Sequence, residues 1–491
     1  MKLIIKFFSE ITIKSSSVRI SFIKILFNNI CKVLKKYDKL VRIYYFWDYI
    51  EVLLKKHDDN EYKNILSVLI NIPGIQTILR IKEHTWENIS DIYKKVFNLY
   101  RNFLIGKTFC VRVKRKGKHN FTSQDIEKYI GFCLNRDIPG TSVNLTKPEY
   151  LVLLQIIDNK LILILDEIRG LGGFPIGTQQ SVLSLISGGF DSAVASYMLI
   201  KRGCRVNYCF FNFSGHDNEY YVRKIVYHLW NTFGVSHSVF FISLNFVSVI
   251  DMMLQNISDS QIGIVLKRMM IRTASILAKK YNILSLLTGE VLGQVSSQTM
   301  TNLNIINRVS DSLVLRPLIT YSKDDIINIS RKIGTEKYSK KVPEYCGLLY
   351  KKPTVHAIEN IVLKEENKFD FSILLHDVIR KAKIFDVCVI GKKLKYENSN
   401  NIEVTSIIGN NDVILDIRPL DRMKNKILFN NKNLVDIKVI PFHNLISQFK
   451  KLDQSKIYLL YCDYGFISKI HANCLYKKGF RNIKIYRPFL D

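Results

Sequence analysis

Residues 187–192 read Ser-Gly-Gly-Phe-Asp-Ser, and they follow directly after the apolar run Val182–Ile186. The apolar run is typical of a strand buried on both faces, and the pattern of Ala193–Arg202 predicts a helix after the loop. A glycine-containing loop between a buried strand and a helix is the arrangement by which α/β folds hold phosphate groups. The stretch therefore predicts an α/β domain with a ligand site at this loop.

The residue types within the loop suit an anion. Gly188 and Gly189 let backbone N–H groups close on an oxyanion without a Cβ in the way. Ser187 and Ser192 add hydroxyl donors, and Asp191 can hold Mg²⁺ or orient a phosphate-bound ligand. The loop lacks the Gly-Lys-Ser/Thr ending of a Walker loop. We predict a nucleotide site from which pyrophosphate leaves; for a lone Gly-Gly pair, a tight turn without a ligand would be the better interpretation.

The chain divides into several predicted domains, because 491 residues exceed one ordinary core. From residue 178 onward apolar strands alternate with helices, which predicts a doubly wound parallel sheet. The segment after this domain is helical and then irregular, and it is low in glycine, so we expect a connector there. The predicted divisions are two α+β units (1–60 and 61–167), the nucleotide domain (178–354), the connector (355–405) and a last α/β unit (406–491).

The overall composition excludes several classes of protein. With 47% apolar and 23% charged residues, the chain is globular rather than disordered. The formal charge of +29 suits a protein that meets a polyanion, although a drift toward A/T-rich codons would also enrich lysine. A signal peptide at the N-terminus is not expected, because Lys6 and Glu10 interrupt the apolar stretch. Without an 18-residue apolar run we expect no membrane span.

The nine cysteines are irregularly spaced and include no Cys-x-x-Cys pair, so we expect a reducing, cytoplasmic setting and no metal site.

A second segment, Leu286–Thr299, offers further nucleotide contacts. Its strand ends in Thr-Gly-Glu and would lie beside the first strand, at the carboxyl edge where open sheets bind ligands. Gly289 permits close approach of a ring or a phosphate, and Gln294, Ser297 and Gln298 offer neutral hydrogen-bonding groups. Alone, this segment would be interpreted as an ordinary polar loop, and its value comes from the pairing with the first loop.

A helix is predicted over 264–280, because its apolar residues recur at the spacing of one buried helix face. Two cations stand near the start of this helix. Lys267 and Arg268 interrupt this apolar pattern. Either could be a solvated charge. We expect one of them to reach the phosphates of the nucleotide, and we choose Lys267.

Cys462 follows the strand Ile457–Leu460 and precedes a predicted helix. Backbone N–H groups at a helix N-terminus stabilise a thiolate or a persulfide anion. The loop resembles the active-site loop of rhodaneses, and Asp416 and Arg418 match the Asp-x-Arg at a strand end of those enzymes. Cysteine phosphatases close this loop with an arginine, whereas position 468 is Ser, so sulfur transfer is favoured over phosphate hydrolysis.

Cys346 is a candidate partner for Cys462, because it lies in a predicted loop, Pro343–Gly347, at the end of the nucleotide domain. Beside a second reactive cysteine it becomes a candidate resolving thiol, and the two would form a transient disulfide.

A basic strand lies in the second α+β unit. In the strand over 108–115, Phe109, Val111 and Val113 are predicted to point inward, alternating with Arg112 and Lys114, which point outward. A solvated strand is one interpretation, and phosphate contacts with RNA are the one that we favour. The candidate RNA-binding residues are Arg112, Lys114, Arg115, Lys116 and Lys118.

Together these features resemble one family over nearly the full chain, the tRNA 4-thiouridine sulfurtransferases called ThiI, in their long form with a rhodanese tail. The hexapeptide is similar to the PP-loop of ATP pyrophosphatases, which activate a carbonyl oxygen by adenylation. The other motifs that carry the resemblance are Gly106–Arg115, Gly172–Thr178, Thr288–Gln298 and Pro343–Gly347.

The resemblance implies a fold and a set of ligand contacts. The α/β multidomain fold would comprise an N-terminal ferredoxin-like domain, a THUMP domain that binds RNA, a doubly wound PP-loop domain and a rhodanese domain. It also implies that Leu185, Ile186, Lys267, Gly289 and Gln298 contact ATP, with Mg²⁺ arriving on the nucleotide and no permanently bound cofactor.

The implied reaction is the thiolation of uridine 8 in tRNA. ATP would adenylate O4, a persulfide on Cys462 would deliver sulfur to C4, and Cys346 would resolve the persulfide as a Cys346–Cys462 disulfide. The implied partners are tRNA, a cysteine desulfurase, the sulfur-carrier protein of thiamine thiazole synthesis and a second copy of the chain.

Two other classes of function stay open from the residues alone. One is a PP-loop amidotransferase or synthetase that uses nitrogen, and the other is an RNA-binding module with vestigial catalytic loops.

Overall fold

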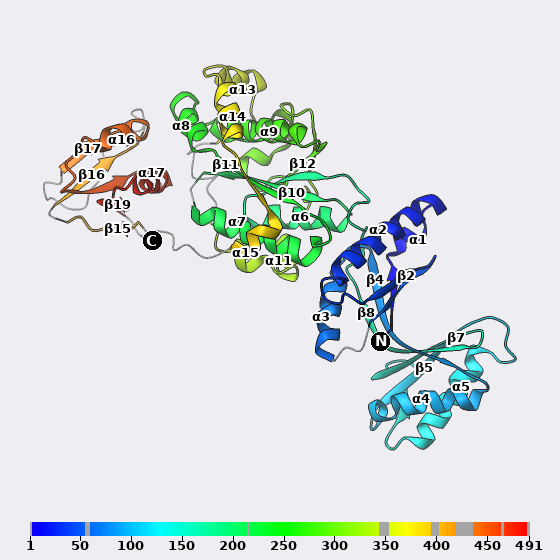
Figure 1. Ribbon diagram of the computed structural model, residues 1–491. Coiled ribbons are helices and arrows are strands. Elements are labelled where there is room, and N and C mark those ends of the chain that lie inside the picture. The colour runs from blue at the N-terminus through cyan, green and yellow to red at the C-terminus, as the bar shows by residue number, and fades with distance from the viewer. Residues whose placement is uncertain are drawn as a thin grey trace. The chain divides into compact units, whose positions relative to one another are not determined.

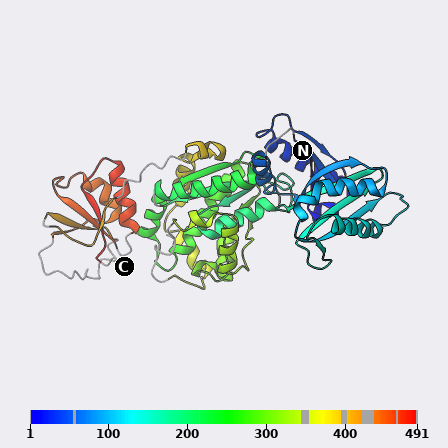
Figure 2. The same cartoon turned by 90° about the horizontal axis from the view of Figure 1, so that it is seen from below.

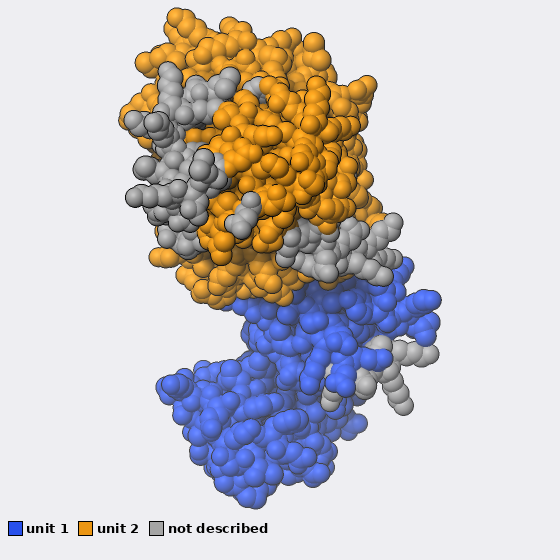
Figure 3. All heavy atoms as spheres, turned by 90° about the vertical axis from the view of Figure 1, so that its left-hand side faces the viewer, with its two compact units in different colours: residues 1–178, 201–203 blue, residues 179–200, 204–491 orange. Residues whose placement is uncertain are grey.

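The computed structural model describes residues 2–54, 59–213, 216–342, 353–393, 402–409, 411–418, 436–462 and 466–488. The chain forms two compact units, which Figure 3 distinguishes by colour. Unit 1 comprises residues 1–178 with 201–203, and unit 2 comprises 179–200 with 204–491. Each unit is described by itself.

The described part of unit 1 forms an eight-stranded sheet in the order β2-β3-β1-β4-β8-β7-β5-β6. Its elements are β1 (Lys2–Phe7), α1 (Ser9–Thr12), α2 (Ser16–Leu34), β2 (Arg42–Tyr45), β3 (Tyr49–Leu53), α3 (Asp59–Leu69), β4 (Ile75–Thr85), α4 (Ile89–Leu104), β5 (Thr108–Lys116), α5 (Ser123–Asp137), β6 (Ser142–Val143), β7 (Tyr150–Ile157) and β8 (Lys160–Arg169).

Alternating side chains build the core beneath α4 and α5. Phe109, Val111 and Val113 of β5 are buried in it, whereas Arg112 and Lys114 are exposed, as the period-two pattern predicts. The helix α5 begins with a capping box, in which Thr122 and Asp125 satisfy each other's backbone N–H groups. The alternation leaves the cations of this strand on the face of the sheet that points away from this core.

Within the described residues of unit 2, six strands form a sheet in the order β13-β12-β9-β10-β11-β14. Helices lie on both of its faces, with α8 and α9 on one and α6 and α7 on the other (Figure 1). The elements are β9 (Val182–Leu185), α6 (Phe190–Lys201), β10 (Val206–Asn212), α7 (His216–Leu229), η1 (Trp230–Gly234), β11 (Phe240–Asn245), α8 (Val247–Asn256), α9 (Ile262–Lys280), β12 (Ser285–Leu287), η2 (Ser296–Gln298), α10 (Met300–Asn307), β13 (Leu313–Leu315), α11 (Lys323–Lys332), α12 (Glu336–Ser339), α13 (Glu359–Glu366), α14 (Phe371–Arg380), β14 (Lys383–Asp386) and α15 (Val387–Lys393).

The strand order places a topological switch at β9. The chain proceeds from β9 to β10 and β11 in one direction, and β12 and β13 are added on the other side of β9. The pairs of β9 with β10 and with β12 are both parallel. Ligands of doubly wound sheets bind at the carboxyl ends of the strands beside such a switch. The loop after β9 stands at this point.

The predicted connector, 355–405, requires a correction. Its strand β14 pairs antiparallel with β11 and completes the edge of the nucleotide-domain sheet, with Phe385 opposite Phe241. Its helix α13 ends in Glu366, whose carboxylate is buried against α9. The low glycine content of this segment therefore reflects ordinary helix and strand positions, and a short edge strand carries little sequence signal.

The last part of unit 2 forms a parallel sheet, whose described strands run in the order β15-β19-β18-β16-β17. Figure 2 shows these strands with the helices coloured orange to red beside them. The elements are β15 (Val404–Thr405), β16 (Asp412–Asp416), β17 (Asp436–Val439), α16 (Phe442–Phe449), β18 (Ile457–Tyr461), α17 (Phe466–Lys477) and β19 (Ile483–Tyr486).

Candidate active site

The loop after β9 depends on a glycine in the left-handed region. Gly188 has φ +89°, and a Cβ there would lie 2.8 Å from Val222 Cγ2 and 3.0 Å from Val342 Cγ1. Both neighbours are branched side chains, so a larger residue would be strained and crowded. Glycine at this position lets the backbone between Ser187 and the start of α6 lie close to Val222 and Val342.

The two serines of the loop bind each other. Ser192 Oγ accepts a hydrogen bond from Ser187 N (3.2 Å), and the two hydroxyl oxygens lie 3.2 Å apart. Gly189 N points toward Ser187 Oγ at 3.4 Å. Ser192 is buried, whereas Ser187 is exposed. The serines thus preform the loop, and Ser187 is the one whose hydroxyl also reaches solvent.

Asp191 stands in the first turn of α6, between a cation and an amide. Lys323 Nζ lies 2.8 Å from Asp191 Oδ1, and Gln294 Nε2 donates to Asp191 Oδ2 at 3.1 Å. Lys323 also lies 5.7 Å from the ring centroid of Phe190. Lys323 was not among the residues predicted from the sequence. Its position in the segment after β13 would have been the signal, because that strand ends at the same sheet edge.

The second nucleotide segment abuts the first. A Cβ on Gly289 would lie 2.6 Å from the carbonyl carbon of Asp191 and 2.6 Å from the N of Ser192. These are backbone atoms and cannot rotate away. Gly289 therefore allows the loop after β12 to touch the N-terminus of α6. The structure brings these two predicted segments together.

Gln298 ends the segment with a buried polar group. Its side-chain oxygen Oε1 is buried and has no hydrogen-bond partner among the described residues. Its backbone oxygen accepts from Gly293 N at 2.9 Å. A buried amide oxygen normally has a donor, so a ligand donor such as an exocyclic amine fits this position.

A buried ion pair fixes the edge of the sheet beside Gly289. Arg316, just after β13, donates from Nε to Glu290 Oε2 at 2.8 Å, and Thr288 Oγ1 donates to the same oxygen at 3.0 Å. The Glu290 side chain is buried. The pair joins the ends of β12 and β13. Arg316 was not among the residues predicted from the sequence.

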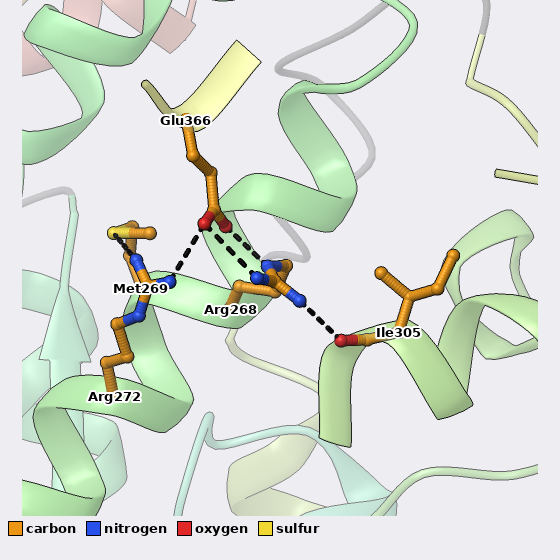
Figure 4. A network of polar contacts seen from close by, with 5 residues as sticks. All are labelled: Arg268, Met269, Arg272, Ile305 and Glu366. Carbon is orange, nitrogen blue, oxygen red and sulfur yellow. Dashed lines mark hydrogen bonds and ion pairs between the residues drawn. The ribbon is translucent and has the colours of Figure 1, made fainter. Parts of the chain in front are cut away.

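Lys267 and Arg268, the two candidate cations of α9, have different surroundings. Arg268 is 3% exposed, and its guanidinium pairs with both oxygens of Glu366 and donates to the backbone oxygen of Ile305 (Figure 4). Arg272 binds the same carboxylate at 2.9 Å. Arg268 is thus fully engaged in joining α9, α10 and α13. Lys267, the residue chosen for the phosphates, is half-buried on the same helix.

Cys462 lies at the end of β18 and faces the N-terminus of α17. Ser468 N donates to Cys462 Sγ at 3.3 Å, and Ser468 Oγ lies 3.4 Å from the sulfur. The cysteine is 5% exposed. A backbone N–H and a hydroxyl in the first turn of a helix suit a sulfur anion.

Asp416 and Arg418 form a buried ion pair beside the end of β18. Arg418 donates from Nε to Asp416 Oδ1 at 3.0 Å and from Nη2 to Oδ2 at 2.7 Å. The guanidinium carbon lies 5.3 Å from the ring centroid of Tyr461, the residue before Cys462. The Asp-x-Arg thus braces the strand end that carries the sulfur. Cys346 lies outside the described residues.

The basic strand presents exposed cations in unit 1. Arg112 donates to the backbone oxygen of Leu145 at 3.2 Å, and Arg115 donates to that of Gly117 at 3.1 Å. Lys114, Lys116 and Lys118 are exposed. Two guanidinium groups thus have backbone partners, and the lysines extend from the same strand and turn.

Two further findings concern the described ranges alone. They contain no cluster of three or more His, Cys, Asp or Glu residues that could hold a metal ion. None of their helices is long and apolar enough to cross a membrane.

Known proteins resemble this chain over its whole length. The chain is 51% identical to the tRNA sulfurtransferase of Blochmanniella pennsylvanica and 50% identical to that of Sodalis glossinidius, in each case over 99% of this chain and 100% of the relative. The tRNA sulfurtransferase of Escherichia coli O1:K1 is 50% identical over 99% of the chain.

Family profiles match three segments. They are described as ThiI ferredoxin-like domain (residues 2–78), THUMP domain (87–166) and Thiamine biosynthesis protein (ThiI) (177–371).

Solved structures share the fold. A 4-thiouridine synthetase, crystallised with RNA and bound ATP, superposes with a TM-score of 0.69 at 24% identity and covers 79% of this chain and 99% of its own. PH1313 from Pyrococcus horikoshii superposes with a TM-score of 0.51 at 20% identity, over 68% of this chain and 100% of its own. With a ferredoxin-like domain, a THUMP domain, a PP-loop domain and an end-to-end likeness to named relatives, the chain belongs to the tRNA sulfurtransferase (ThiI) family.

Proposed function

We propose that the chain is an ATP-dependent sulfurtransferase that converts uridine 8 of tRNA to 4-thiouridine. One observation carries the proposal above the others. In a chain half-identical to tRNA sulfurtransferases from end to end, the loop Ser187–Ser192 and the segment around Gly289 meet at the switch point of a doubly wound sheet.

The activating half of the reaction takes place at this loop. The backbone of Gly188 and Gly189, with the hydroxyl of Ser187, holds the phosphates of ATP at the N-terminus of α6. Lys267 and Lys323 neutralise the charge that develops on the leaving pyrophosphate, and Asp191 orients Lys323 or binds the Mg²⁺ that travels with ATP.

The base of ATP lies between the loop and the second segment. Leu185 and Ile186 contact it from the end of β9, Gly289 holds the second segment against the N-terminus of α6, and Gln298 Oε1 accepts from the exocyclic amine of adenine. Uridine O4 then attacks the α-phosphate, pyrophosphate leaves, and C4 becomes electrophilic.

The sulfur-delivering half depends on two cysteines. A cysteine desulfurase loads Cys462 with a persulfide, which Ser468 N stabilises. The terminal sulfur attacks C4 and AMP leaves, so that a mixed disulfide joins C4 to Cys462. The Cys346 thiolate attacks the Cys462 sulfur, which releases the thiolated base and leaves a Cys346–Cys462 disulfide. An external dithiol reductant reopens this disulfide.

The partners follow from this scheme. The THUMP domain and the ferredoxin-like domain bind tRNA by shape and backbone contacts, with Arg112, Lys114, Arg115, Lys116 and Lys118 on its phosphates. We expect a homodimer in the cytoplasm. A second role, sulfur supply to the carrier protein of thiazole synthesis, is favoured by the description of the family that matches residues 177–371.

Mass analysis of tRNA nucleosides tests the proposal. Unmodified tRNA is incubated with the chain, ATP and a persulfide donor, and 4-thiouridine is expected at position 8 together with pyrophosphate release. Incubation without ATP is the control and should give no thiolated nucleoside. Incorporation of nitrogen in place of sulfur would favour an amidotransferase, and tRNA binding without any modification would favour a plain RNA-binding module.

A further inference from the structure

We propose that the hairpin formed by β2 and β3 is a stacking platform for unpaired nucleotides of the RNA substrate. The platform consists of the aromatic side chains of residues 44–49, a segment to which the sequence analysis gave no role. The inference rests on the proposed function, because it concerns how the same RNA is held.

The platform exposes its rings to solvent. Tyr44, Tyr45, Phe46 and Trp47 follow one another in the chain, and their exposed fractions are 46%, 45%, 43% and 47%. Aromatic side chains stabilise a fold most when they are buried. Four consecutive ones that remain half-exposed therefore add little to the stability of the core. Exposed rings of this kind can stack on flat, apolar ligands.

A buried arginine fixes the tip of the hairpin. Arg19 of α2 donates to the backbone oxygen of Trp47 (2.8 Å), to Asp48 Oδ1 (2.9 Å) and to the backbone oxygen of Thr12 (3.1 Å). Its guanidinium carbon lies 4.3 Å from the ring centroid of Trp47. The Arg19 guanidinium thus holds one face of the indole, and the ring stays half-exposed. Because the ring is already fixed, little side-chain entropy is lost when a base stacks on it.

A pair of rings, Phe46 and Tyr49, is also preformed. Phe46 N donates to the backbone oxygen of Tyr49 at 2.8 Å, and the two rings stack with centroids 4.7 Å apart and planes inclined by 28°. Lys6 Nζ of β1 lies 5.0 Å from the Tyr49 centroid. The hairpin therefore offers fixed aromatic rings with a cation next to them.

Positive charge lies next to the platform and precedes it in the chain. Burial lowers the pKa of Lys6; the carboxylate of Asp48 opposes this shift, and the like charge of Lys114 adds to it. Lys114 belongs to the basic strand β5, and its charge acts on Lys6. The exposed residues Lys35, Lys36, Lys39 and Arg42 precede the rings in the chain. A bound phosphate would relieve the repulsion between Lys6 and Lys114.

RNA is the occupant that these observations favour. Cations that follow the backbone, together with aromatic rings that stack on bases, are the combination by which proteins hold single-stranded nucleic acid. Asp48, the acidic residue at the tip, is neutralised by Arg19. A second copy of this chain, with formal charge +29, would bring like charge to this surface.

Binding of tRNA to full-length variants tests the platform. Trp47→Leu keeps the apolar bulk and removes the aromatic face, so we expect about ten-fold weaker binding at fixed salt. Trp47→Phe keeps a ring, and its affinity should remain within about three-fold of the parent. The salt dependence of binding should be the same in both variants, because no phosphate contact is lost.

The controls separate stacking from other effects. Phe132→Leu removes an exposed ring on α5, outside the platform, and should leave the affinity unchanged. A fully paired RNA duplex should bind the parent and Trp47→Leu equally. Circular dichroism confirms that each variant is folded, and quenching of tryptophan fluorescence by RNA should be smaller in Trp47→Phe than in the parent.

Two results would overturn the inference. One is equal tRNA affinity of Trp47→Leu and the parent, and the other is a change of oligomeric state in Trp47→Leu without RNA, which would make the platform an interface between copies. Thiolation by the parent is measured in parallel. Its absence contradicts the proposed function, whereas the binding comparison decides the platform independently.

Discussion

Several polar residues of the proposed nucleotide site are already paired with one another. Asp191 binds both Lys323 and Gln294, and Ser187 binds Ser192. Preformed pairs need no reorganisation when a charged ligand enters, which is the physical basis of electrostatic catalysis. The ion pair between Asp191 and Lys323 also means that each residue sets the position of the other.

At this residue scale, we expect Asp191→Ala and Lys323→Gln each to lower ATP-dependent pyrophosphate release at least about 100-fold, because both act on developing phosphate charge. Pyrophosphate release by the double variant should be only a little lower than by either single variant, since the two residues act as a unit. Pyrophosphate release is measured with tRNA present. Unchanged release in Asp191→Ala would show that its assigned role is wrong.

Cys462→Ser should abolish tRNA thiolation while ATP-dependent pyrophosphate release continues, because serine cannot carry a persulfide. Cys474→Ser, on the helix α17 whose N-terminus faces Cys462, is the matched control and should thiolate tRNA normally. The two assays are run on the same preparations. Thiolated tRNA produced by the Cys462→Ser protein would contradict the sulfur relay.

At the scale of elements, the site exists because the loops after β9 and β12 touch. Gly289→Ala would place a Cβ 2.6 Å from the backbone of Asp191. We expect a loss of stability of about 1–3 kcal/mol from overpacking and a marked loss of ATP affinity, since the two loops must separate.

Gly131→Ala is the comparison for this prediction. It adds a Cβ within α5 that meets nothing within 4 Å, and it should stabilise the protein by about 0.5–1 kcal/mol. Thermal denaturation and ATP titration distinguish the two variants. Full ATP affinity in Gly289→Ala would show that ATP binding does not need the close approach of the loop after β12 to the N-terminus of α6.

His228 of α7 makes the stability of unit 2 depend on pH. Its Nε2 lies 2.7 Å from the backbone oxygen of Ile333, and burial, assisted by Lys337, lowers the pKa of the imidazole below its ordinary value although that hydrogen bond opposes the shift. The unfolded chain therefore binds a proton near pH 6.5 that the folded chain resists, and stability falls as the pH drops below that value.

We expect His228→Gln, which keeps an N–H donor and does not titrate, to lose less stability than the parent between pH 7.5 and pH 5.5, a range of about one unit on either side of the free imidazole pKa. The melting temperature of each protein at the two pH values is the measurement. Identical pH dependence in both proteins would exclude this histidine as the cause.

At the scale of the whole molecule, the charge of +29 predicts tRNA binding that weakens steeply with salt. Replacing Lys114, Lys116 or Lys118 with Gln should each reduce the slope of log affinity against log salt by about one if that lysine contacts a phosphate. Lys279→Gln in unit 2, which removes a lysine paired with Asp311, is the control and should leave the slope unchanged. Slopes that stay equal in all the variants would exclude the basic strand from the interface.

Much of the architecture could be predicted from local pattern. The alternation in β5 and the apolar runs of β9 and β18 gave the correct strands, because the burial of one or both faces leaves a direct periodic signal. The edge strand β14 was not predicted, since four residues that pair along one side leave no such signal.

The sequence by itself determined which chemistry the chain carries. The hexapeptide Ser187–Ser192 and the loop of Cys462 are local, and each needs only its own strand and helix to be recognised. The tertiary structure alone decided which distant residues complete the sites. Lys323 reaches Asp191, and Gly289 abuts Ser192, because parallel strands that are far apart in the chain end at one edge of a sheet. Arg19 fixes Trp47 for the same kind of reason, since a helix and a hairpin meet only after folding.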